Sequence, residues 1–569
     1  MIEVLINGNE IYAVNSGEKT SIDKNIISCD ISVEINRFIK NLEKESVNNT
    51  AIKDMYIYDD IEVYNFARGT ICNKVKDILS KFLLIEALVD KFGEEKIKIY
   101  TSDPVYKYIC NSLFKIAISE VQDNIDINKE NKEPNNKMMK TKRIFKGFIF
   151  LLKYKFKNIR NENILFMTHC SDINNIKIGN KNLHYDCQFG EVLESFKKEK
   201  NVFRIQYLNN DSILNKSEKI GDDFFPFEDF IILKKILYRM KLNQDKLNNR
   251  LYLLKDFNLN FHNYNLYGLF NEFLFKNLKD IFDSYIYEIY SAEKFLKILK
   301  FDKIICTDEA DRARCFIYSG NKLNIPTFAI QHGIITEASV SYFIPSKENI
   351  YVPSKTFVWG EEFKEKLLEG TIIYNDNNVV VVGQPRTDYL YNKISNTDIG
   401  QTRDENLKIL YATQYIKELA REATEFLFSS LSKYGEKYEV IIKLHPNDTY
   451  YDMYDEIAKK YNVNNIKITK DMDIYDAIIW SDIVISVHST VNLEAAVLNK
   501  PSICLLLNNY WDQGNFVKNN ISKGAKNEEE LIDLLNDINW DANDRYIERN
   551  FYKVDGLVAN RIKEVINSY

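Results

Sequence analysis

The chain has 569 residues, of which 45% are hydrophobic and 28% are charged, a balance typical of a soluble globular protein with enough chain for about three domains. Its net charge of −6 excludes a general attraction to nucleic acid or lipid. The eight cysteines are scattered without a CxxC pair, so we expect neither a zinc site nor a disulfide framework.

Residues 1–121 predict an N-terminal α/β module. Apolar, β-branched and aromatic runs at 55–58 and 96–100 indicate strands, and a helical stretch occupies 75–92. The first residues lack a basic stretch followed by a long apolar one, so we expect no secretory signal and a cytoplasmic location. The module either completes the domain that follows or forms a separate recognition module.

Residues 122–160 predict a polar linker and a basic amphipathic helix. The stretch 122–136 is built almost entirely from Asn, Asp, Lys and Glu. From 137 to 160 there is no acidic residue, and lysines and arginines surround an apolar run too short for a bilayer, which needs about 20 residues. A helix over 143–158 suits peripheral contact with an anionic membrane. The alternative is a helix packed on its own protein with a solvated basic rim.

Residues 161–400 predict the first of two domains in which strands and helices alternate. Such alternation is typical of a doubly wound parallel sheet. Long helical stretches are expected around 228–300, and another helix begins within 307–314. The expected strands are 164–167, 202–205, 303–306, 326–330, 356–360 and 379–383.

Residues 401–569 predict a second domain of the same kind. A helix is expected at 491–498. The expected strands are 407–414, 438–442, 466–469, 482–485 and 501–507. Two doubly wound domains that face one another leave a cleft between them, and such clefts are favoured sites for small molecules.

Three histidines stand in short phrases directly after predicted strands. The phrases are Gln331-His332-Gly333, Lys443-Leu444-His445-Pro446 and Ser486-Val487-His488-Ser489-Thr490. Ligands of open α/β sheets bind outside the carboxyl ends of the strands, so these phrases indicate an anionic ligand. Ser489 and Thr490 also suit the start of a helix, which would offer N–H groups, hydroxyls and a positive dipole end to a phosphate. Plain capping without a ligand is the alternative.

The order of these and neighbouring motifs resembles GT-B fold glycosyltransferases of bacterial surface-carbohydrate synthesis. The likeness covers residues 300–510 and is greatest for enzymes with cytidine-nucleotide donors: capsule and Kdo transferases, sialyl- and polysialyltransferases, and CDP-glycerol glycerophosphotransferases. The further motifs that carry it are Phe357-Val358-Trp359-Gly360-Glu361, Val382-Gly383-Gln384-Pro385-Arg386, Glu494-Ala495-Ala496 and Lys500-Pro501.

The resemblance implies roles for several residues. The His-Pro motif of sialyltransferases contacts the donor phosphate and falls on His445 with Pro446, and a phosphate-holding Ser-Ser/Thr motif falls on Ser489 with Thr490. A motif of two acidic residues and glycine supplies the base that deprotonates the acceptor. Asp308-Glu309-Ala310 is similar, although alanine stands where glycine is expected, so the base is Asp308 or Glu309.

Other residues near these motifs suit the same chemistry. A departing phosphate needs positive or hydrogen-bonding groups, which Arg386 and Lys443 supply, and His332 has a place at the acceptor or the phosphate. Glu494 suits a ribose hydroxyl, or it is an ordinary glutamate on a helix surface. We include the flanking Gln331, Gly333, Gly383, Ser486 and His488 among the donor-binding candidates.

These observations predict an inverting, metal-independent glycosyltransferase without a cofactor. We expect it to move a nonulosonate or Kdo-type sugar from a CMP donor onto a surface glycan, lipid-linked or protein acceptor, in the cytoplasm or at the inner face of the membrane. The alternatives are a CDP-polyol phosphotransferase, a nucleotide-sugar epimerase of the same fold, and a non-catalytic scaffold. The chain has neither a P-loop nor a GxGxxG after the first strand of either domain. Asp471-Met472-Asp473 is interpreted as a helix start rather than a metal motif.

Overall fold

The computed structural model describes most of the chain, and its residues fall into two compact units. One unit comprises Met1–Cys170, Phe196–Thr356 and Glu365–Val380, and the other comprises Ser171–Ser195, Phe357–Lys364 and Val381–Tyr569. The described residues are 2–7, 10–15, 18–21, 31–119, 145, 149, 152, 162–168, 173–178, 181–186, 188–206, 242–336, 339–395, 406–414, 416–435, 437–445, 448–507, 515–540 and 544–569.

The first unit begins with a mixed sheet in the order β3-β2-β1-β8-β9, in which β1 runs antiparallel to β2 and parallel to β8. The predicted strands appear as β6 (Tyr56–Tyr58) and β8 (Ile97–Tyr100). The other bounds are β1 (Ile2–Asn7), β2 (Glu10–Asn15), β3 (Glu18–Ser21), α1 (Ile31–Lys44), β4 (Ser46–Val47), β5 (Thr50–Ala51), η2 (Ile52–Asp54), β7 (Ile61–Glu62), α2 (Tyr64–Phe92), η3 (Glu94–Lys96), α3 (Pro104–Tyr108), η4 (Ile109–Phe114) and β9 (Ala117–Ser119).

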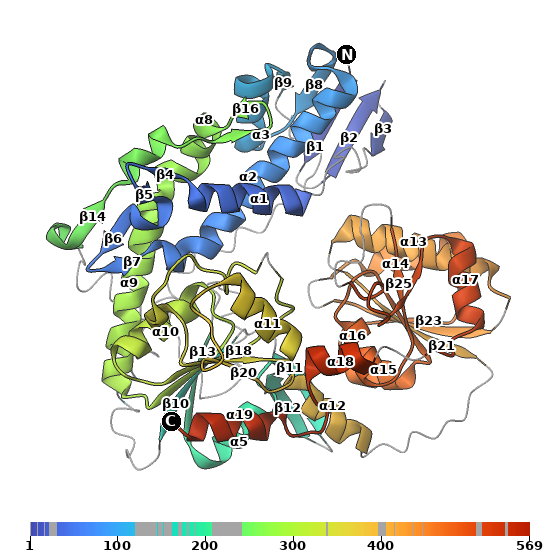
Figure 1. The fold of residues 1–569 in the computed structure, drawn as a ribbon. Helices are drawn as coiled ribbons and strands as arrows, with labels where there is room; N and C mark the ends of the chain where they lie inside the picture. The colour runs from blue at the N-terminus through green and yellow to red at the C-terminus, as the bar shows by residue number, and fades with distance from the viewer. Residues whose placement is uncertain are drawn as a thin grey trace. The chain divides into compact units, whose positions relative to one another are not determined.

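Helix α2 is the long helix of this module and confirms the helical stretch predicted over 75–92 (Figure 1). Its buried positions Val75, Ile78, Leu79 and Phe82 share one face of the helix. From Phe82 to Ile85 every residue is buried, so this part of the helix is enclosed on several sides.

A six-stranded sheet follows, in the order β13-β10-β17-β18-β19-β20. Strand β10 pairs in parallel with β13 and with β17, and β17 pairs in parallel with β18. Helices α9 and α10 cover one face with a core that includes Phe295, Phe316 and Ile304. The bounds are β10 (Asn163–Thr168), β13 (Asn201–Gln206), α9 (Lys276–Leu299), β17 (Lys303–Thr307), α10 (Asp311–Lys322), β18 (Thr327–Ile330), η9 (Asn349–Tyr351), β19 (Lys355–Val358) and β20 (Val379–Val381).

The prediction of helix across 228–300 is wrong for residues 242–266, and 228–241 lie outside the described residues. Asparagine side chains here accept backbone hydrogen bonds two residues on, as at Leu251 N to Asn249 and Tyr267 N to Asn265. Such local bonds compete with a helix. The elements are η6 (Gln244–Lys246), β14 (Leu247–Asn249), η7 (Leu251–Asp256), β15 (Asn260–Phe261), β16 (Tyr264–Asn265), α8 (Tyr267–Phe270) and η8 (Asn271–Phe275).

The second unit contains another six-stranded sheet, in the order β23-β22-β21-β24-β25-β26, and all its strands are parallel. Helices α13, α14 and α17 cover one face, whereas α12, α15 and α16 pack on the other. The bounds are α12 (Arg386–Ser395), β21 (Leu407–Ala412), α13 (Lys417–Lys433), β22 (Tyr438–Lys443), α14 (Tyr451–Tyr461), β23 (Ile466–Thr469), α15 (Ile474–Trp480), β24 (Ile483–Ser486), α16 (Val491–Val497), β25 (Ser502–Leu505), β26 (Lys523–Ala525) and α17 (Glu528–Asn536).

Both six-stranded sheets therefore have the doubly wound, Rossmann-like architecture that the sequence predicts. Counted along the chain, the strand order of the second sheet is 3-2-1-4-5-6, so the order reverses between β21 and β24. In the first sheet it reverses between β10 and β17. The carboxyl ends of these strands are where such sheets bind ligands.

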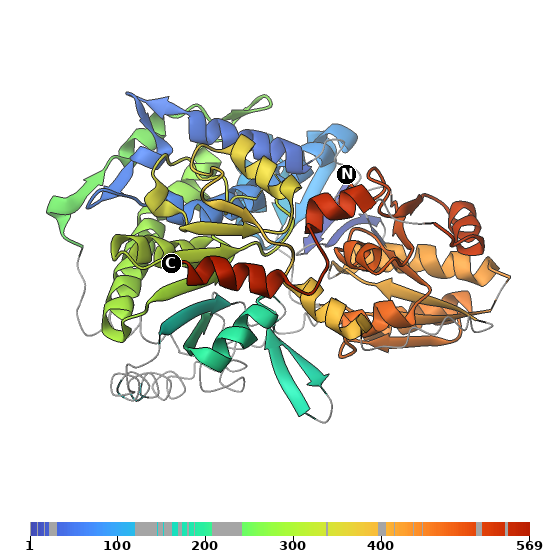
Figure 2. The same cartoon turned by 60° about the horizontal axis from the view of Figure 1, so that its bottom comes forward.

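The remaining elements include a small hairpin of β11 and β12, which Figure 2 shows as two antiparallel strands. The bounds are β11 (Ile173–Ile178), β12 (Lys181–Asp186), α5 (Glu191–Glu199), α11 (Glu361–Gly370), α18 (Asp544–Phe551) and α19 (Val558–Asn567). Within the described part of the chain, no helix has the length and apolar character needed to cross a bilayer. Of the predicted basic helix, only Phe145, Ile149 and Leu152 are described, and all three are helical and exposed.

Candidate functional site

The donor-side candidates in the second unit follow the carboxyl ends of three neighbouring strands. Lys443 ends β22 and His445 stands two residues later, Thr413 follows β21, and Ser486 ends β24 just before His488. Because β22, β21 and β24 are adjacent and parallel, these residues lie at one edge of the sheet, around the point where its strand order reverses.

His445 is half-buried beside a network of fully buried polar groups. Burial lowers the pKa of its imidazole, the charge of Asp448 raises that pKa, and Lys443 and Lys470 lower it. Burial lowers the pKa of Lys443 as well. Pro446, the other half of the predicted motif, lies outside the described residues. The arrangement gives the site an imidazole and two ammonium groups, a set suited to an anion.

Two residues of this network, Thr413 and Asp448, were not predicted from the sequence. The Thr413 hydroxyl lies 3.1 Å from the backbone nitrogen of His445, and Asp448 is fully buried three residues after that histidine. The available signals were a threonine at the end of a predicted strand and an aspartate closing the turn that follows the His-Pro pair.

The Ser486–Thr490 phrase divides into a buried and a half-buried part. The Ser486 hydroxyl is fully buried, donates to Asn492 Oδ1 at 3.0 Å and accepts the Ser489 N–H at 3.3 Å. Ser486 thus holds the turn, while His488, Ser489 and Thr490 are half-buried.

Thr490 is the N-cap residue of α16 without a side-chain cap hydrogen bond, and Ser489 accepts the Val491 N–H at 3.3 Å. Capping therefore accounts for Ser489 and not for the Thr490 hydroxyl. Burial lowers the pKa of His488.

Arg386 and Glu494 come together in the second unit. Arg386 Nη1 lies 3.3 Å from Glu494 Oε1, and Glu494 is buried. Burial raises the pKa of the Glu494 carboxyl, and the charge of Arg386 lowers it. These two donor-binding candidates thus form an ion pair with each other. The pair was not predicted, because the two residues lie far apart in the sequence.

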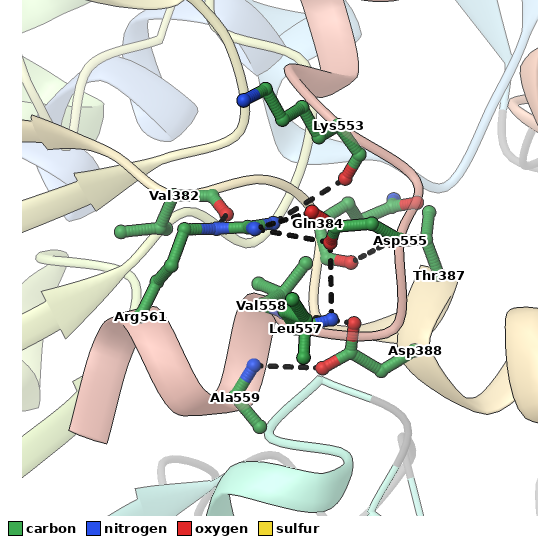
Figure 3. A network of polar contacts seen from close by, with 10 residues as sticks. All are labelled: Val382, Gln384, Thr387, Asp388, Lys553, Asp555, Leu557, Val558, Ala559 and Arg561. Atoms are coloured by element: carbon green, nitrogen blue, oxygen red, sulfur yellow. Dashed lines mark hydrogen bonds and ion pairs between the residues drawn. The ribbon is translucent and has the colours of Figure 1, made fainter. Parts of the chain in front are cut away.

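The loop before Arg386 and the first turn of α12 are tied to the C-terminal helix α19 (Figure 3). Asp388 accepts the N–H groups of Val558 at 3.0 Å and Ala559 at 2.7 Å, and Arg561 Nε donates to the Val382 carbonyl at 2.8 Å. Gly383 has a φ of 99°, and a Cβ there would stand 2.8 Å from Val558 Cγ2. Backbone conformation and the contact with α19 explain why glycine stands at 383.

In the first unit, Asp308 and His332 follow the adjacent parallel strands β17 and β18. The Asp308 N–H donates to the Ile330 carbonyl at 2.9 Å, so the hydrogen bonding between β17 and β18 extends to Asp308. Asp308 has a φ of 71° and its carboxylate accepts the Glu309 N–H at 2.5 Å. Asp308 and His332 are both half-buried, so each retains contact with solvent.

Glu309, the other candidate base, points into the protein. It has no exposed surface, and its carboxylate accepts hydrogen bonds from Thr356 Oγ1 at 2.7 Å and Tyr374 Oη at 2.6 Å. Burial raises its pKa to about 7, against the lowering effects of Arg314 and the two hydroxyl donors. A side chain enclosed in this way has no access to an acceptor hydroxyl.

The segment after His332 is held by two buried arginines that the sequence analysis did not single out. Arg68 of α2 pairs with Glu43 and donates to the Val340 carbonyl at 2.8 Å. Arg314 of α10 donates to the carbonyl of the next residue, Ser341, and to that of Tyr351. The N-terminal module thereby helps to fix the His332 segment, in which Gln331 is buried and donates to the Gly333 carbonyl at 2.8 Å.

The other candidates have local explanations. Asp473 caps α15 by accepting the N–H groups of Tyr475 and Asp476, so its interpretation as a helix start is confirmed. His262 pairs with Glu86 through Nδ1 at 2.7 Å. His169 lies outside the described residues, and the side chain of His184 in β12 is not described. Among the described residues, no cluster of His, Cys, Asp or Glu has the arrangement of a metal site.

Comparison with known sequences finds a family and a relative to which part of the chain is similar. A family model described as CDP-Glycerol:Poly(glycerophosphate) glycerophosphotransferase matches residues 347–567. The chain is also similar to the teichoic acid glycerol-phosphate primase of Bacillus subtilis (strain 168), with 25% identity over 159 residues, or 27% of this chain. The matched part is 40% of that relative, so the chain spans about two fifths of the relative's length.

Comparison with solved structures finds proteins of low sequence identity. UDP-GlcNAc 2-epimerase from Neisseria meningitidis, bound to UDP-GlcNAc, has a TM-score of 0.45 and 15% identity, covering 72% of this chain and all of the other. A putative UDP-N-acetylglucosamine 2-epimerase from Listeria monocytogenes has a TM-score of 0.45 and 16% identity, with coverage of 72% and 96%. MurG from Acinetobacter baumannii has a TM-score of 0.41 and 13% identity, with coverage of 72% and 100%.

Proposed function

We propose that this protein is a transferase that moves a glycerol phosphate or related polyol phosphate unit from a CDP-linked donor to a cell-surface polymer or its precursor. The observation that carries the proposal is the family match over residues 347–567, because it spans Arg386, His445, Ser489 and Glu494. The comparisons favour this alternative over transfer of a sugar from a CMP donor, which keeps only the support of the sequence resemblance.

The reaction requires an attack at phosphorus. An acceptor hydroxyl oxygen bonds to the phosphorus that carries the polyol, the bond from that phosphorus to the bridging oxygen breaks, and CMP departs with that oxygen. The acceptor proton passes to a base, and the charge that develops on CMP needs hydrogen-bond donors or cations.

The donor-side role falls on the residues after β22 and β24. His445 and Lys443 stand where a diphosphate would meet an imidazole and an ammonium group, and the Thr490 hydroxyl at α16 makes no cap hydrogen bond. Burial lowers the pKa of His445, which favours the neutral imidazole that donates through a single ring N–H. A bound diphosphate favours its protonated form.

The acceptor-side role falls on Asp308, with His332 beside it at the next strand end. Asp308 is half-buried and in a left-handed conformation, which is uncommon and often found at functional sites, whereas Glu309 is enclosed. We therefore assign the base to Asp308 and a supporting role for the fold to Glu309.

We also propose that residues 1–121 complete the acceptor side. Arg68 of this module pairs with Glu43 and donates to the carbonyl of Val340, eight residues after His332. The basic segment 143–158 would add peripheral contact with an anionic membrane, since Phe145, Ile149 and Leu152 are exposed at the spacing of one helix face.

The donor class is tested by calorimetric titration of the protein with CDP, CMP and UDP, followed by an assay of CMP release from CDP-glycerol. We expect CDP to bind more tightly than CMP, and CMP release to depend on a glycerophosphate acceptor. Binding of UDP alone would refute a cytidine donor. Release of CMP from a CMP-sugar but not from CDP-glycerol would restore sugar transfer, and binding of no nucleotide would favour a scaffold.

The site is tested by His445→Ala. Loss of the phosphate-side donor should lower turnover by about 10²- to 10⁴-fold, the range for groups that assist proton transfer or charge development. His262→Ala is a matched control, because this histidine pairs with Glu86 on a different part of the fold. Near-normal turnover of folded His445→Ala would show that the donor phosphate lies elsewhere.

A further inference from the structure

A buried polar relay lies directly beneath His445 in the second unit. The His445 backbone N–H donates to Thr413 Oγ1 at 3.1 Å, and the Thr413 hydroxyl donates to Asp448 Oδ2 at 2.7 Å. An N–H group only donates and an ionised carboxylate only accepts, so the direction of both hydrogen bonds is fixed. Thr413 therefore links the backbone of His445 to the carboxylate of Asp448.

Asp448 is the end of this relay and is saturated with donors. Its carboxylate also accepts the Tyr454 hydroxyl at 2.5 Å and the Tyr450 N–H at 2.9 Å. Its own N–H donates to the His445 carbonyl at 2.8 Å, which closes the turn from 445 to 448. The side chain has no exposed surface. Burial of a carboxylate is costly unless it is hydrogen-bonded, and the three donors to the Asp448 side chain offset that cost.

What these contacts fix is the backbone on both sides of His445. Its N–H is bound to Thr413, its carbonyl is bound to the Asp448 N–H, and Lys470 Nζ donates to the Asp448 carbonyl at 2.9 Å. The Thr413 N–H donates in turn to the Lys443 carbonyl at 3.1 Å. The direction in which the imidazole leaves the sheet is thus determined by β21 as well as by β22.

We propose that Thr413 and Asp448 are positioning residues that hold His445 in place at the donor phosphate. The inference rests on the proposed function of His445 and extends it to two residues that do not belong to the motifs named in the sequence analysis. Neither residue has exposed surface comparable to that of His445, so both act through it rather than on the donor.

The charge of Asp448 gives this inference a readout that a purely structural residue lacks. The charged groups that act on the His445 imidazole are Asp448, Lys443 and Lys470, and only Asp448 raises its pKa. Removing this charge by Asp448→Asn should lower the pKa of His445 further. Asp452→Asn is the matched control, since it removes the same charge from an exposed position on α14.

The first measurement is a pH titration of the full chain labelled with ¹³C-histidine and followed by NMR. The protein has six histidines, and the signal missing in His445→Ala identifies the one to follow. We expect Asp448→Asn to move the titration of His445 to lower pH and Asp452→Asn to leave it in place. Equal titration curves in the two variants would overturn the inference, whatever the substrate of the protein is.

The second measurement separates position from charge. Thr413→Val removes the hydroxyl without changing charge, and Thr413→Ser keeps it. We expect Thr413→Val to weaken CDP binding and to lower turnover by up to about 100-fold, the cost of a misplaced catalytic group. Thr413→Ser should restore both. If Thr413→Val has the CDP affinity and turnover of wild type, the inference is also overturned. If the wild-type protein does not bind CDP, the proposed function is overturned instead. The histidine titration then remains as the test of whether Asp448 acts on His445.

Discussion

Glu309→Gln is the substitution that best separates the two candidate bases. Glutamine has the shape of glutamate but cannot ionise, so the variant keeps the packing of Glu309 and removes its charge. Among the described residues, Thr356 and Tyr374 donate hydrogen bonds to the buried carboxyl, and both hydroxyls can reorient to suit an amide. We expect turnover to stay within about two-fold of wild type, since Glu309 does not reach the acceptor. Asp308→Asn should instead lose about 10²- to 10⁴-fold, because it removes a general base.

The same variant has a calculable effect on stability. The pKa of Glu309 is about 7 in the folded protein against an ordinary value of 4.5. Because the folded pKa is raised, the folded state binds more protons than the unfolded state between these values, and stability falls as pH rises through this window. The full difference corresponds to about 3–4 kcal/mol, of which about 2–3 kcal/mol lies between pH 5 and pH 8.

The assay is scanning calorimetry of wild type and Glu309→Gln at pH 5 and at pH 8. At pH 5 the folded carboxyl is protonated and resembles the amide, so the two proteins should have similar stability. At pH 8 the variant should be the more stable by about 2–3 kcal/mol, because wild type carries a buried charge.

Two results would refute this reasoning. If the stability difference between variant and wild type is the same at both pH values, Glu309 does not carry a raised pKa. If folded Glu309→Gln loses as much turnover as Asp308→Asn, the enclosed carboxylate takes part in the reaction and the base is misassigned.

Three further predictions concern the support of the sites. Arg68→Lys should keep the pairing with Glu43 but lose the hydrogen bond to the Val340 carbonyl in the loop after His332. The KM for the acceptor should therefore rise several-fold, while the KM for the donor changes little. Arg37→Gln, which breaks an exposed ion pair on α1, is the control in the same kinetic assay. Asp388→Ala should lower the stability of the second unit by about 1–3 kcal/mol in thermal melts, because two N–H groups at the start of α19 lose their acceptor. An unchanged melting temperature would contradict the network of Figure 3. Deletion of 143–158 should abolish flotation with anionic vesicles at low salt and leave nucleotide binding unchanged; persistent flotation would mean that another surface contacts the membrane.

The sequence predicted the two doubly wound sheets because their strands are short and apolar on both faces. In β17 every residue is buried, and the apolar run from Ile304 to Cys306 in its middle is easy to recognise. The region 242–266 was mispredicted because its asparagines bond to nearby backbone, and this preference is weaker as a sequence signal than hydrophobic spacing.

The candidate sites were predictable where a residue follows a strand, and not where partners come from distant parts of the chain. His332 and His445 were found because each follows a predicted strand, whereas Asp308 was found through the resemblance of Asp308-Glu309-Ala310 to a family motif. The hydrogen bond from Arg68 to the Val340 carbonyl joins residues 272 positions apart, and no local pattern records it. Thr413 and Asp448 were missed for the same reason, since their role depends on the pairing of β21 with β22.

Exposure separates the candidates more clearly than residue type does. At both sites a half-buried polar residue stands at a strand end and fully buried groups lie behind it: His445 over Thr413 and Asp448, and Asp308 beside Glu309. Carboxylates occur in both layers, so a motif with two acids does not by itself identify the reactive one. The group that reacts must exchange protons with a substrate, which requires access, whereas the group that positions must hold its hydrogen bonds against water, which requires burial. By this criterion the two acids of the Asp308-Glu309 pair have different tasks, and substituting them one at a time should give a loss of turnover at the first and a pH-dependent change in stability at the second.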